Sequence, residues 1–525
     1  MPPPLHKRHA ALVIIGHGST LNPDSSSPTH QHAETIRRMG VFAEVACAFW
    51  KEEPSMSEVC SMLNSREIYL VPNFISEGYF CQEVLPRELK VTGPVTQLHD
   101  RTLYYCDPVG AHRNMTKLLL QRADEVAPGV PRGETSLIIV GHGTSLNDNS
   151  TKAIKDQVEL IRSGGYGFAE VIDTYMEEAP LVNDWHTLTT CPNVVVVPFF
   201  IADGLHSYQD IPVLLGMEAE TGAAASQREV FRHNPHHLHG RQLYYSSAIG
   251  TEPHLAEVIL DQVADFDARH RPATVETSPA PSIVDWLRSK LCTGSLLIGK
   301  MRVRKDVTNS IALGDDGILR LPRIAGDLSP SCLIIGQVQV RADGESFLLH
   351  HVEDTGKLPK LQLFEGHEAA REVAQLDDAG EFRPLKSAPN LRHGWLVRVA
   401  TLEDLHIALD HLYPAALGLA MEEEQGRLQP TPLRDNLGRQ TGMYRFTNTI
   451  TDDQAMDMIA HTCDTTTQCR RRITWGLTKD QPLYGPALPK ASAPVDGDVP
   501  LLCIDACPLL VSAARKVAQG KASSK

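Results

Sequence analysis

Two histidines in nearly identical sequence contexts are the first residues that could do chemistry. His17 lies in Leu-Val-Ile-Ile-Gly-His-Gly at 12–18, and His142 lies in Leu-Ile-Ile-Val-Gly-His-Gly at 137–143. Each follows a short aliphatic strand and stands between two glycines, which let the backbone turn sharply and let a ligand approach closely. The two histidines are 125 residues apart, a spacing that indicates a duplicated domain.

The second copy carries further groups of the right chemistry. His206 comes after the strand at 193–198, and Glu177 and Glu178 come after the strand at 169–175. In an open parallel sheet, ligands bind beyond the carboxyl ends of the strands. Two imidazoles and a carboxylate at that edge would form an open site for a borderline divalent metal ion. They would also serve as an acid/base set, because histidine titrates near neutral pH.

In both copies, predicted strands alternate with predicted helices along the sequence, and these elements must position the groups named above. This order, with nearly continuous apolar strands, predicts an α/β fold of two tandem modules, each a parallel sheet covered by helices on both faces. About 14 residues are inserted in the second copy between Gly204 and Tyr244. The insert includes the His-rich run 233–239, which we interpret as a loop that is either simply polar or able to gather metal.

The second copy resembles a known family. Residues 140–147 (Val-Gly-His-Gly-Thr-Ser-Leu-Asn) and 197–212 (Val-Pro-Phe-Phe-Ile-Ala-Asp-Gly-Leu-His-Ser-Tyr-Gln-Asp-Ile-Pro) closely resemble the CbiX-type sirohydrochlorin chelatases, which share their architecture with the class II chelatases. The resemblance covers about residues 10–265. It implies a lyase that inserts Co²⁺ or Fe²⁺ into sirohydrochlorin, without a nucleotide, for cobalamin or sirohaem biosynthesis; Ni²⁺ stays open.

The resemblance also implies roles for individual residues. His142 and His206 match the two metal-site histidines of the family, which also accept the protons of the tetrapyrrole. Glu177 matches the acidic residue, but it lies one position closer to Pro180 than is usual, so Glu178 competes for this role. The carboxylates of sirohydrochlorin would bind to helix N-termini and to cations such as Lys152 and Lys155.

The first copy departs from the pattern. It keeps His17, but Phe80 stands where the second copy has His206, and Lys51 stands where it has Glu177. We therefore expect a degenerate first module that forms the other wall of the substrate cleft. In the alternative, a half-site, His17 helps to hold the macrocycle.

Composition excludes several classes of protein. The chain has 525 residues, a formal net charge of −14 and 42% hydrophobic residues, which is typical of a globular protein and argues against wholesale nucleic-acid binding. The sequence contains no apolar run long enough to span a membrane and no signal peptide, so we expect a cytoplasmic protein.

We expect two chelatase-like modules, 1–127 (module A) and 131–268 (module B), followed by a Pro/Ser/Thr-rich linker at 269–282. Beyond it, an α+β middle domain is expected at 283–440. Its strands are predicted at 295–299, 332–340 and 394–399, and its helices at 366–376 and 402–412. A last domain, 441–525, completes the chain.

The last domain holds four of the 11 cysteines, Cys463, Cys469, Cys503 and Cys507. Four thiolates in two close pairs can hold a [4Fe–4S] cluster or a structural zinc ion. Gaps of five and three residues fit zinc poorly, and Pro508 after Cys507 favours the cluster; thiols without a ligand or disulfides are the remaining alternatives, and a reducing cytoplasm disfavours disulfides. The other cysteines are expected to be buried thiols outside disulfides.

The order of domains resembles a deinococcal CbiX-like protein with a C-terminal iron–sulfur domain. The role of the cluster has three alternatives: redox sensing, electron delivery from a donor, or stabilisation of the domain.

Two other functions compete with the chelatase. One is a non-catalytic carrier of tetrapyrrole or metal, and the other is a redox enzyme that uses sirohaem and the cluster.

Overall fold

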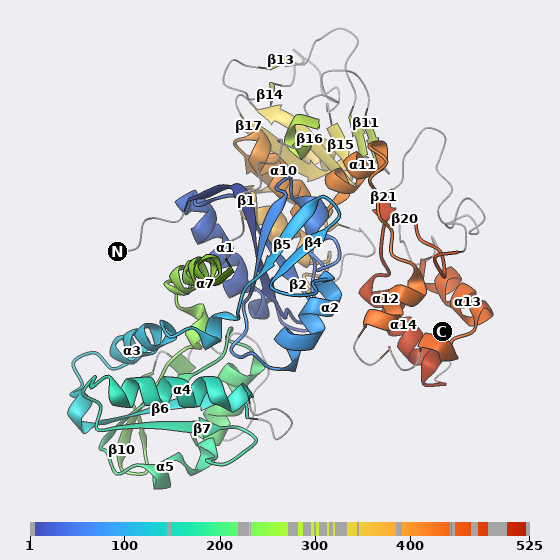
Figure 1. The fold of residues 1–525 in the computed structure, drawn as a ribbon. Coiled ribbons are helices and arrows are strands. Elements are labelled where there is room, and N and C mark those ends of the chain that lie inside the picture. The colour runs from blue at the N-terminus through green and yellow to red at the C-terminus, as the bar shows by residue number, and fades with distance from the viewer. Residues whose placement is uncertain are drawn as a thin grey trace. The chain divides into compact units, whose positions relative to one another are not determined.

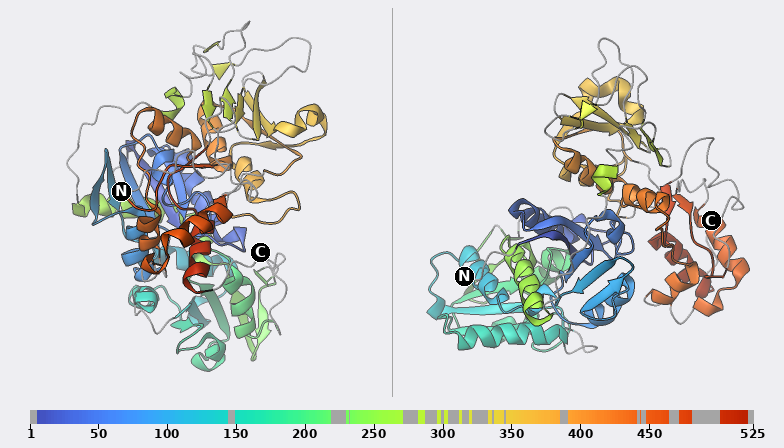
Figure 2. Two further views of the ribbon diagram at one scale, coloured as in Figure 1. Left: turned by 90° about the vertical axis from the view of Figure 1, so that its right-hand side faces the viewer. Right: turned by 45° about the horizontal axis from the view of Figure 1, so that its top comes forward.

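The computed structural model consists of two compact units, shown from three directions in Figures 1 and 2. The first contains Met1–Trp50 and Ser65–Thr277, and the second contains Lys51–Asn64 and Ser278–Lys525. The structure describes residues 6–143, 149–218, 230–231, 233–270, 282–286, 296–298, 301–303, 312–313, 319–320, 333–335, 337–343, 346–384, 391–440, 443, 447–463, 471–480 and 501–520.

Module A is built on a five-stranded sheet with the order β2-β1-β3-β5-β4. Its strands are β1 (Lys7–Gly16), β2 (Phe42–Phe49), β3 (Glu67–Pro72), β4 (Val95–Leu98) and β5 (Arg101–Tyr105). The side chains of β1 from Ala10 to Ile15 are fully buried, because helices cover both faces of the sheet. In sequence, module A contains the helices α1 (Ser27–Met39), α2 (Leu85–Leu89) and α3 (Met115–Val126).

Module B repeats this topology with the order β7-β6-β8-β10-β9. Its strands are β6 (Thr135–Gly141), β7 (Glu170–Tyr175), β8 (Asn193–Pro198), β9 (His236–Leu238) and β10 (Arg241–Tyr245). Its helices are α4 (Asn149–Ser163), α5 (Trp185–Leu188), α6 (Ile211–Leu214) and α7 (Leu255–His270). The prediction of two α/β modules is confirmed.

Two details of the prediction need correction. Each sheet is mixed, because β4 and β9 run antiparallel to their neighbours β5 and β10. The His-rich run is also not a loop throughout, since His236–Leu238 is the edge strand β9. His239 and Gly240 have φ angles of 50° and 73°, and two residues of positive φ form the tight turn that closes a two-residue hairpin. The ring of His239 stacks on that of His186 at 4.2 Å.

The two modules exchange their last helices. Helix α7, at the end of module B, packs on α1 and β3 of module A, and α3, at the end of module A, packs on α4 and β8 of module B (Figure 1). Phe266 of α7 is buried against Tyr69 and Tyr104 of module A. Full burial of such a ring contributes roughly 1.5–3 kcal/mol. The exchange joins both sheets through one continuous hydrophobic core.

The middle part of the chain forms a seven-stranded sheet with the order β11-β12-β15-β16-β17-β19-β18. The strands are β11 (Leu296–Ile298), β12 (Met301–Val303), β15 (Leu333–Ile335), β16 (Val338–Asp343), β17 (Ser346–His351), β18 (Gln362–Glu365) and β19 (Trp395–Val399). The helices are α9 (Glu368–Gln375), α10 (Leu402–Leu412) and α11 (Ala416–Glu424). The predicted strands and helices are present, but 332–340 is divided between the antiparallel strands β15 and β16.

The C-terminal part contains α12 (Leu433–Arg439), α13 (Asp452–Cys463) and α14 (Pro508–Ala518), with the short parallel strands β20 (Arg471–Ile473) and β21 (Leu501–Cys503). Leu433 and Leu437 of α12 are buried in one core with Trp475, Leu510 and Val511. Helix α12 therefore packs with the cysteine-bearing elements, although it precedes residue 441.

A segment of module A belongs to the second unit. Residues 51–64 leave the end of β2 and pack within the second unit, where Ser61 donates a hydrogen bond of 3.0 Å to Glu422. A Cβ on Gly418 would lie 1.7 Å from the carbonyl oxygen of Ser61, so only glycine allows α11 to approach this closely. The corresponding segment of module B, which follows β7, stays within the first unit.

The eight cysteines that the structure describes form no disulfide with one another. Cys47, Cys81, Cys106 and Cys191 are buried, as predicted, whereas Cys60 is partly exposed, and Cys292 and Cys332 lie outside the described residues. Within the described part of the chain, no helix combines the length and the apolar character that are needed to cross a membrane.

Candidate active site

His142 lies directly beyond the carboxyl end of β6. Gly141, the last residue of the strand, pairs with Tyr175 of β7. A Cβ on Gly141 would lie 2.1 Å from Ile154, and Gly143 has a φ of 73° with Glu178 and Tyr175 packed against it. Both positions therefore require glycine, and the close packing holds the turn that presents His142. The side chain of His142 is 43% exposed.

His206 begins a five-residue π-helical turn, His206–Asp210, that leads into α6. Its ring lies 5.1 Å from the ring of His142, centroid to centroid, at an interplanar angle of 80°. Single π-helical turns are frequent at functional sites because they re-aim side chains. The tertiary structure thus brings together two histidines that are 64 residues apart in the sequence.

Hydrogen bonds at the two Nδ1 atoms orient both rings. Nδ1 of His206 lies 2.6 Å from the Asp210 carboxylate, and Nδ1 of His142 lies 3.0 Å from the carbonyl oxygen of Gly143. Because both partners are acceptors, each Nδ1 carries the hydrogen and each Nε2 offers a lone pair. A carboxylate behind a histidine also raises its basicity toward a metal ion or a proton.

The two glutamates occupy different environments. A Glu177 carboxylate oxygen lies 3.7 Å from Nδ1 of His142, and the Glu177 side chain is 60% exposed. Glu178 is half-buried against Gly143, and its Oε1 is a buried oxygen with no hydrogen-bond partner in the described structure. Both glutamates thus lie beside the His142 turn, Glu177 toward solvent and Glu178 packed inward.

The site is open rather than a closed metal cage. Among the described residues, the groups whose ligand atoms all lie within 4.8 Å of one another do not include His142, His206 and Glu177. A chelatase must share its metal ion with the nitrogens of a macrocycle, so a wide site with exposed histidines suits a transient ion better than a resident one.

Two aspartates in module B escaped the sequence analysis. Asp210 follows His206 by four residues, the spacing of neighbours along one helix face, and that spacing is the signal that could have revealed it. Asp203 is buried and accepts a 2.7 Å hydrogen bond from the backbone N–H of Ala248. Burial raises the pKa of Asp203 to about 6, with a smaller contribution from Asp24 of module A.

In module A an aromatic cluster replaces the histidine pair. The ring of His17 lies 5.3 Å from Trp50 and 5.4 Å from Phe80, and Phe80 stacks on Phe74 at 5.4 Å. His17 hydrogen-bonds through Nδ1 to the carbonyl oxygen of Gly18, as His142 does to Gly143. Lys51 belongs to the second unit, where burial and Arg515 lower its pKa.

Charged groups at the carboxyl ends of the two sheets influence each other across the modules. Asp24, which follows β1, contributes to the raised pKa of Asp203, which follows β8. Glu77, which follows β3, contributes to the raised pKa of Lys152 in α4, whose main cause is the hydrogen bond to Asp156. The strand ends of module A therefore lie near those of module B.

Lys152 and Lys155 are exposed, and Lys152 pairs with Asp156 at 2.8 Å.

Three of the four predicted cluster cysteines lie in the described structure. Cys463 ends α13, Cys503 ends β21 and Cys507 caps α14, and all three pack against the same hydrophobic core, while Cys469 lies outside the described residues. The indole N–H of Trp475 points to Sγ of Cys503 at 3.5 Å. Thiols gathered on one apolar core, with an N–H donor to sulfur, are the kind of environment that an iron–sulfur cluster requires.

Two arginines that follow the predicted cluster residue Cys469, Arg471 and Arg472, each pair with a glutamate. Arg471 pairs with Glu58, and Arg472 pairs with Glu423. Arg470 lies outside the described residues. The observed pairs therefore favour a structural role for this basic run.

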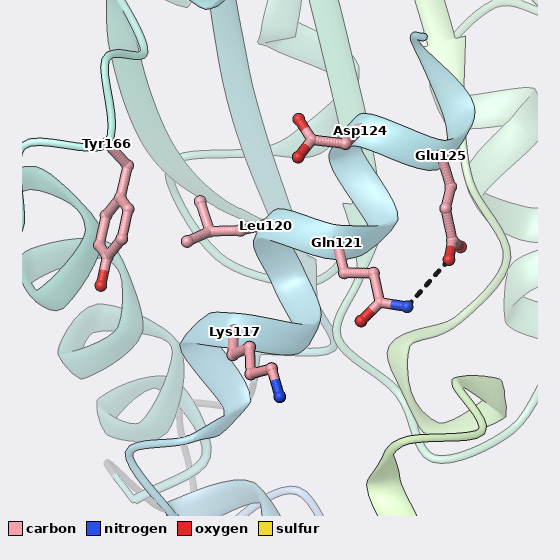
Figure 3. A pocket seen from close by; sticks show the side chains of 6 residues that line it. All are labelled: Lys117, Leu120, Gln121, Asp124, Glu125 and Tyr166. Atoms are coloured by element: carbon pink, nitrogen blue, oxygen red, sulfur yellow. Dashed lines mark hydrogen bonds between the residues drawn. The ribbon is translucent and has the colours of Figure 1, made fainter.

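A pocket of about 520 Å³ lies away from the histidine pair, on the exchanged helix α3 (Figure 3). Figure 3 shows its walls as the side chains of Lys117, Leu120, Gln121, Asp124, Glu125 and Tyr166. It contains none of the residues predicted to do chemistry, and its charged groups already have partners: Gln121 bonds to Glu125, Lys117 pairs with Glu257, and Asp124 pairs with Arg132.

Comparisons with known proteins agree with the fold and the domain order. Residues 11–126 and 136–266 match the CbiX family, residues 328–424 match the DR2241 stabilising domain, and residues 425–516 match a 4Fe-4S iron-sulfur cluster binding domain. The chain is 42% identical over 276 residues to a probable sirohydrochlorin cobaltochelatase of Halobacterium salinarum, covering 49% of this chain and 92% of that protein.

Two further relatives extend this similarity. A sirohydrochlorin cobaltochelatase of Methanopyrus kandleri is 27% identical over 141 residues, covering 25% of this chain and 95% of that protein. The crystal structure of DR2241 from Deinococcus radiodurans, described as a multi-domain protein with structural similarity to chelatases, superposes with a TM-score of 0.72 at 25% identity, covering 98% of this chain and all of that one.

The fold and site define a chelatase-like protein with two α/β modules. The chain belongs to the CbiX family and has the domain order of the multi-domain protein DR2241, with a 4Fe–4S cluster-binding domain at its C-terminal end.

Proposed function

We propose that this protein inserts Co²⁺ into sirohydrochlorin, with Fe²⁺ as the alternative metal. The observation that carries the proposal is the pair His142 and His206, with their rings 5.1 Å apart at the carboxyl edge of a CbiX-type module. Support for the substrate comes from the relative named as a probable sirohydrochlorin cobaltochelatase, 92% of which this chain covers.

The proposed reaction removes two pyrrole N–H protons from the macrocycle as one divalent metal ion enters, so the net charge at its centre is unchanged. His142 and His206 present Nε2 lone pairs that can hold the incoming ion and then accept the departing protons. Asp210 keeps His206 in the required tautomer and stabilises its imidazolium form. Glu177, or its neighbour Glu178, attracts the cation and orients His142. The reaction uses no nucleotide.

Module A takes the role of the opposite wall of the cleft in this proposal. Its cluster of Trp50, Phe74 and Phe80 offers apolar ring faces on which a planar macrocycle can stack. The pKa coupling between Asp24 and Asp203 supports strand ends that approach each other across the modules. His17 would then contact the macrocycle without holding the metal ion.

The carboxylates of sirohydrochlorin need positive partners on a chain of net charge −14. We propose Lys155 and the N-terminal end of α4 for this role, because they follow the Gly-His-Gly turn of module B. Lys152 contributes only after release from Asp156, with which it pairs at 2.8 Å.

For the C-terminal domain we propose that Cys463, Cys469, Cys503 and Cys507 hold the [4Fe–4S] cluster. The three described thiols pack against one core, and Trp475 supplies an N–H donor to Cys503. When bound, such a cluster can exchange one electron; in this chain it would also tie α13, β21 and α14 together. Because α12 packs into the same core, we propose that this domain begins near residue 425 rather than at 441.

The remaining domain limits are proposed as 1–127 and 131–268 for the modules, 269–282 for the linker, and 283 for the start of the middle domain. The exchange of α3 and α7 makes the two modules one folding unit, so neither module should be stable when expressed alone.

The test is anaerobic incubation of sirohydrochlorin with Co²⁺ or Fe²⁺ and full-length protein, followed by absorbance of the metallated product. We expect insertion well above the spontaneous rate, and we expect both His142→Ala and His206→Ala to return it to that rate. Full activity in both variants would contradict the site assignment. Tight binding of sirohydrochlorin without acceleration would instead identify a carrier.

A further inference from the structure

A hydrogen-bond donor that is not itself a cysteine neighbour in sequence points at one of the proposed cluster thiols. The indole N–H of Trp475 donates to Sγ of Cys503 at 3.5 Å. An indole nitrogen can only donate, so this contact keeps its direction whatever the state of the sulfur. The side chain of Trp475 is 1% exposed, so its N–H is shielded from water.

The backbone holds Trp475 in this position from both sides. Just before it, β20 pairs with β21, and Thr474 donates from its backbone N–H and its hydroxyl to the carbonyl oxygen of Cys503, at 3.1 and 2.8 Å. Just after it, the carbonyl oxygen of Gly476 accepts a 2.9 Å hydrogen bond from the backbone N–H of Leu433, at the start of α12. The donor is therefore fixed by strand pairing and by a helix end, and not by a loose surface side chain.

The carboxylate that lies nearest to this thiol in the sequence is already paired. Asp505 is 8% exposed, and its carboxylate pairs with Arg439 of α12 at 2.6 Å and accepts a 2.8 Å hydrogen bond from the backbone N–H of Ala506. The thiol of Cys503 donates to the carbonyl oxygen of Asp505 at 3.2 Å. Binding of iron to this sulfur would release the thiol proton to solvent, while the indole N–H would remain as a donor.

We propose that Trp475 raises the reduction potential of the iron–sulfur cluster by donating its N–H to Cys503, an inference that rests on the proposed cluster ligands. Reduction takes one electron from an external low-potential one-electron donor and adds one negative charge, part of which lies on the cysteine sulfurs. An N–H aimed at a sulfur stabilises this added charge and therefore favours the reduced state. Among the alternatives for the cluster, this favours electron exchange over a purely structural role.

The test measures the reduction potential of the full-length protein with its cluster and needs no activity assay. Anaerobically purified protein is titrated with dithionite in the presence of redox mediators, and the reduced fraction is followed by electron paramagnetic resonance and visible absorbance. Trp475→Phe removes the N–H and keeps a buried aromatic ring. The matched control is Trp395→Phe in the middle domain, because Trp395 is also 1% exposed and donates its indole N–H, in this case to the carbonyl oxygen of Arg392.

At a fixed potential, the ratio of reduced to oxidised cluster should fall about tenfold in Trp475→Phe, which corresponds to a shift of about 59 mV to more negative values for a one-electron couple. Trp395→Phe should match the wild-type protein. The sign of the shift separates a lost donor from a packing defect. Water that enters a space left by the smaller ring would stabilise the more negative reduced state and move the potential in the opposite direction.

Iron and sulfide contents show whether each protein holds a full cluster. If Trp475→Phe does not, the titration is made with a tryptophan analogue at position 475 in which sulfur replaces the indole N–H, so that only the donor is lost. An unchanged or more positive potential in the cluster-loaded variant would overturn the inference. A wild-type protein that takes up no [4Fe–4S] cluster would contradict the proposed ligands, and with them this inference, and the iron and sulfide contents distinguish that failure from the first.

Discussion

Modules A and B have the same strand order and the same Gly-His-Gly turn, yet their histidines have different neighbours. In module B, His142 faces a second imidazole that Asp210 orients. In module A, His17 faces Trp50 and Phe80. The position of His206 in the turn after β8 is taken by Phe80 in the turn after β3, so an aromatic ring replaces one of the two histidines that we propose as metal ligands.

The segments that follow β2 and β7 show a second difference. In module B this segment brings Glu177 to 3.7 Å from His142. In module A the equivalent segment, 51–64, belongs to the second unit. The duplication has thus kept the scaffold in both copies, while the side chains and the following segment differ, and these differences underlie our proposal that only module B binds the ion.

The largest expected effect comes from making module B like module A. His206→Phe removes a lone pair that we propose as a metal ligand and proton acceptor, so kcat/KM for cobalt insertion should fall by about 100-fold or more. The measurement is the initial rate of product absorbance.

The matched control for this exchange is Phe80→Leu in module A. It keeps an apolar side chain, so kcat should stay within about threefold of the wild-type value, with any loss confined to KM for the macrocycle. Equal losses of kcat in both variants would mean that the two modules do not differ in the proposed way.

Asp210→Asn should have the next largest effect. An amide can turn its NH₂ group toward Nδ1 of His206 and place the ring hydrogen on Nε2, which removes the lone pair needed there. Loss of such a supporting carboxylate typically costs 10–100-fold, so we expect about that loss in kcat/KM. Asp184→Asn, an exposed change in the same module, should leave the rate unchanged. A rate for Asp210→Asn equal to that of this control would rule out the orienting role.

The two glutamates can be separated by paired variants. Glu177→Gln should lower kcat/KM about tenfold, because its carboxylate lies near His142 and can attract the cation. Glu178→Gln should lower it less, by about threefold or under, since its side chain packs beside Gly143. Rates and cobalt affinities of both variants, measured side by side, decide the assignment; the reverse order would move the acidic role to Glu178.

The smallest effect concerns stability. The pKa of Asp203 rises from 3.8 to about 6 on folding, so the folded protein binds this proton more tightly than the unfolded chain does. Asp203 therefore stabilises the fold at low pH, and this contribution is lost as pH rises from about 4 to about 6. Asp203→Asn should raise Tm at pH 7 by a few degrees, and the gain should shrink toward pH 4.

The counterpart of Asp203 in module A is Glu77, which is exposed. Glu77→Gln should shift Tm by less than about one degree at either pH, since surface changes rarely exceed about 0.5 kcal/mol. Thermal unfolding of both variants between pH 4 and pH 8 measures the difference. A Tm gain for Asp203→Asn that does not depend on pH would contradict the buried-carboxylate explanation.

Much of this architecture follows from local sequence. Aliphatic runs ending in glycine predict strands, the spacing of the two Gly-His-Gly turns predicts duplication, and strand ends at one sheet edge predict that His142 and His206 meet. These features depend on periodicity and short-range backbone preferences, which a sequence displays directly. The α/β prediction was therefore correct for both modules, and the α+β pattern was correct for the middle domain.

Other features were decided only by tertiary packing. The amphipathic patterns of α3 and α7 require an apolar surface but do not say which sheet supplies it, so their exchange could not be read from sequence. β9 was missed because pairing with β10, and not its polar His-rich composition, makes it a strand.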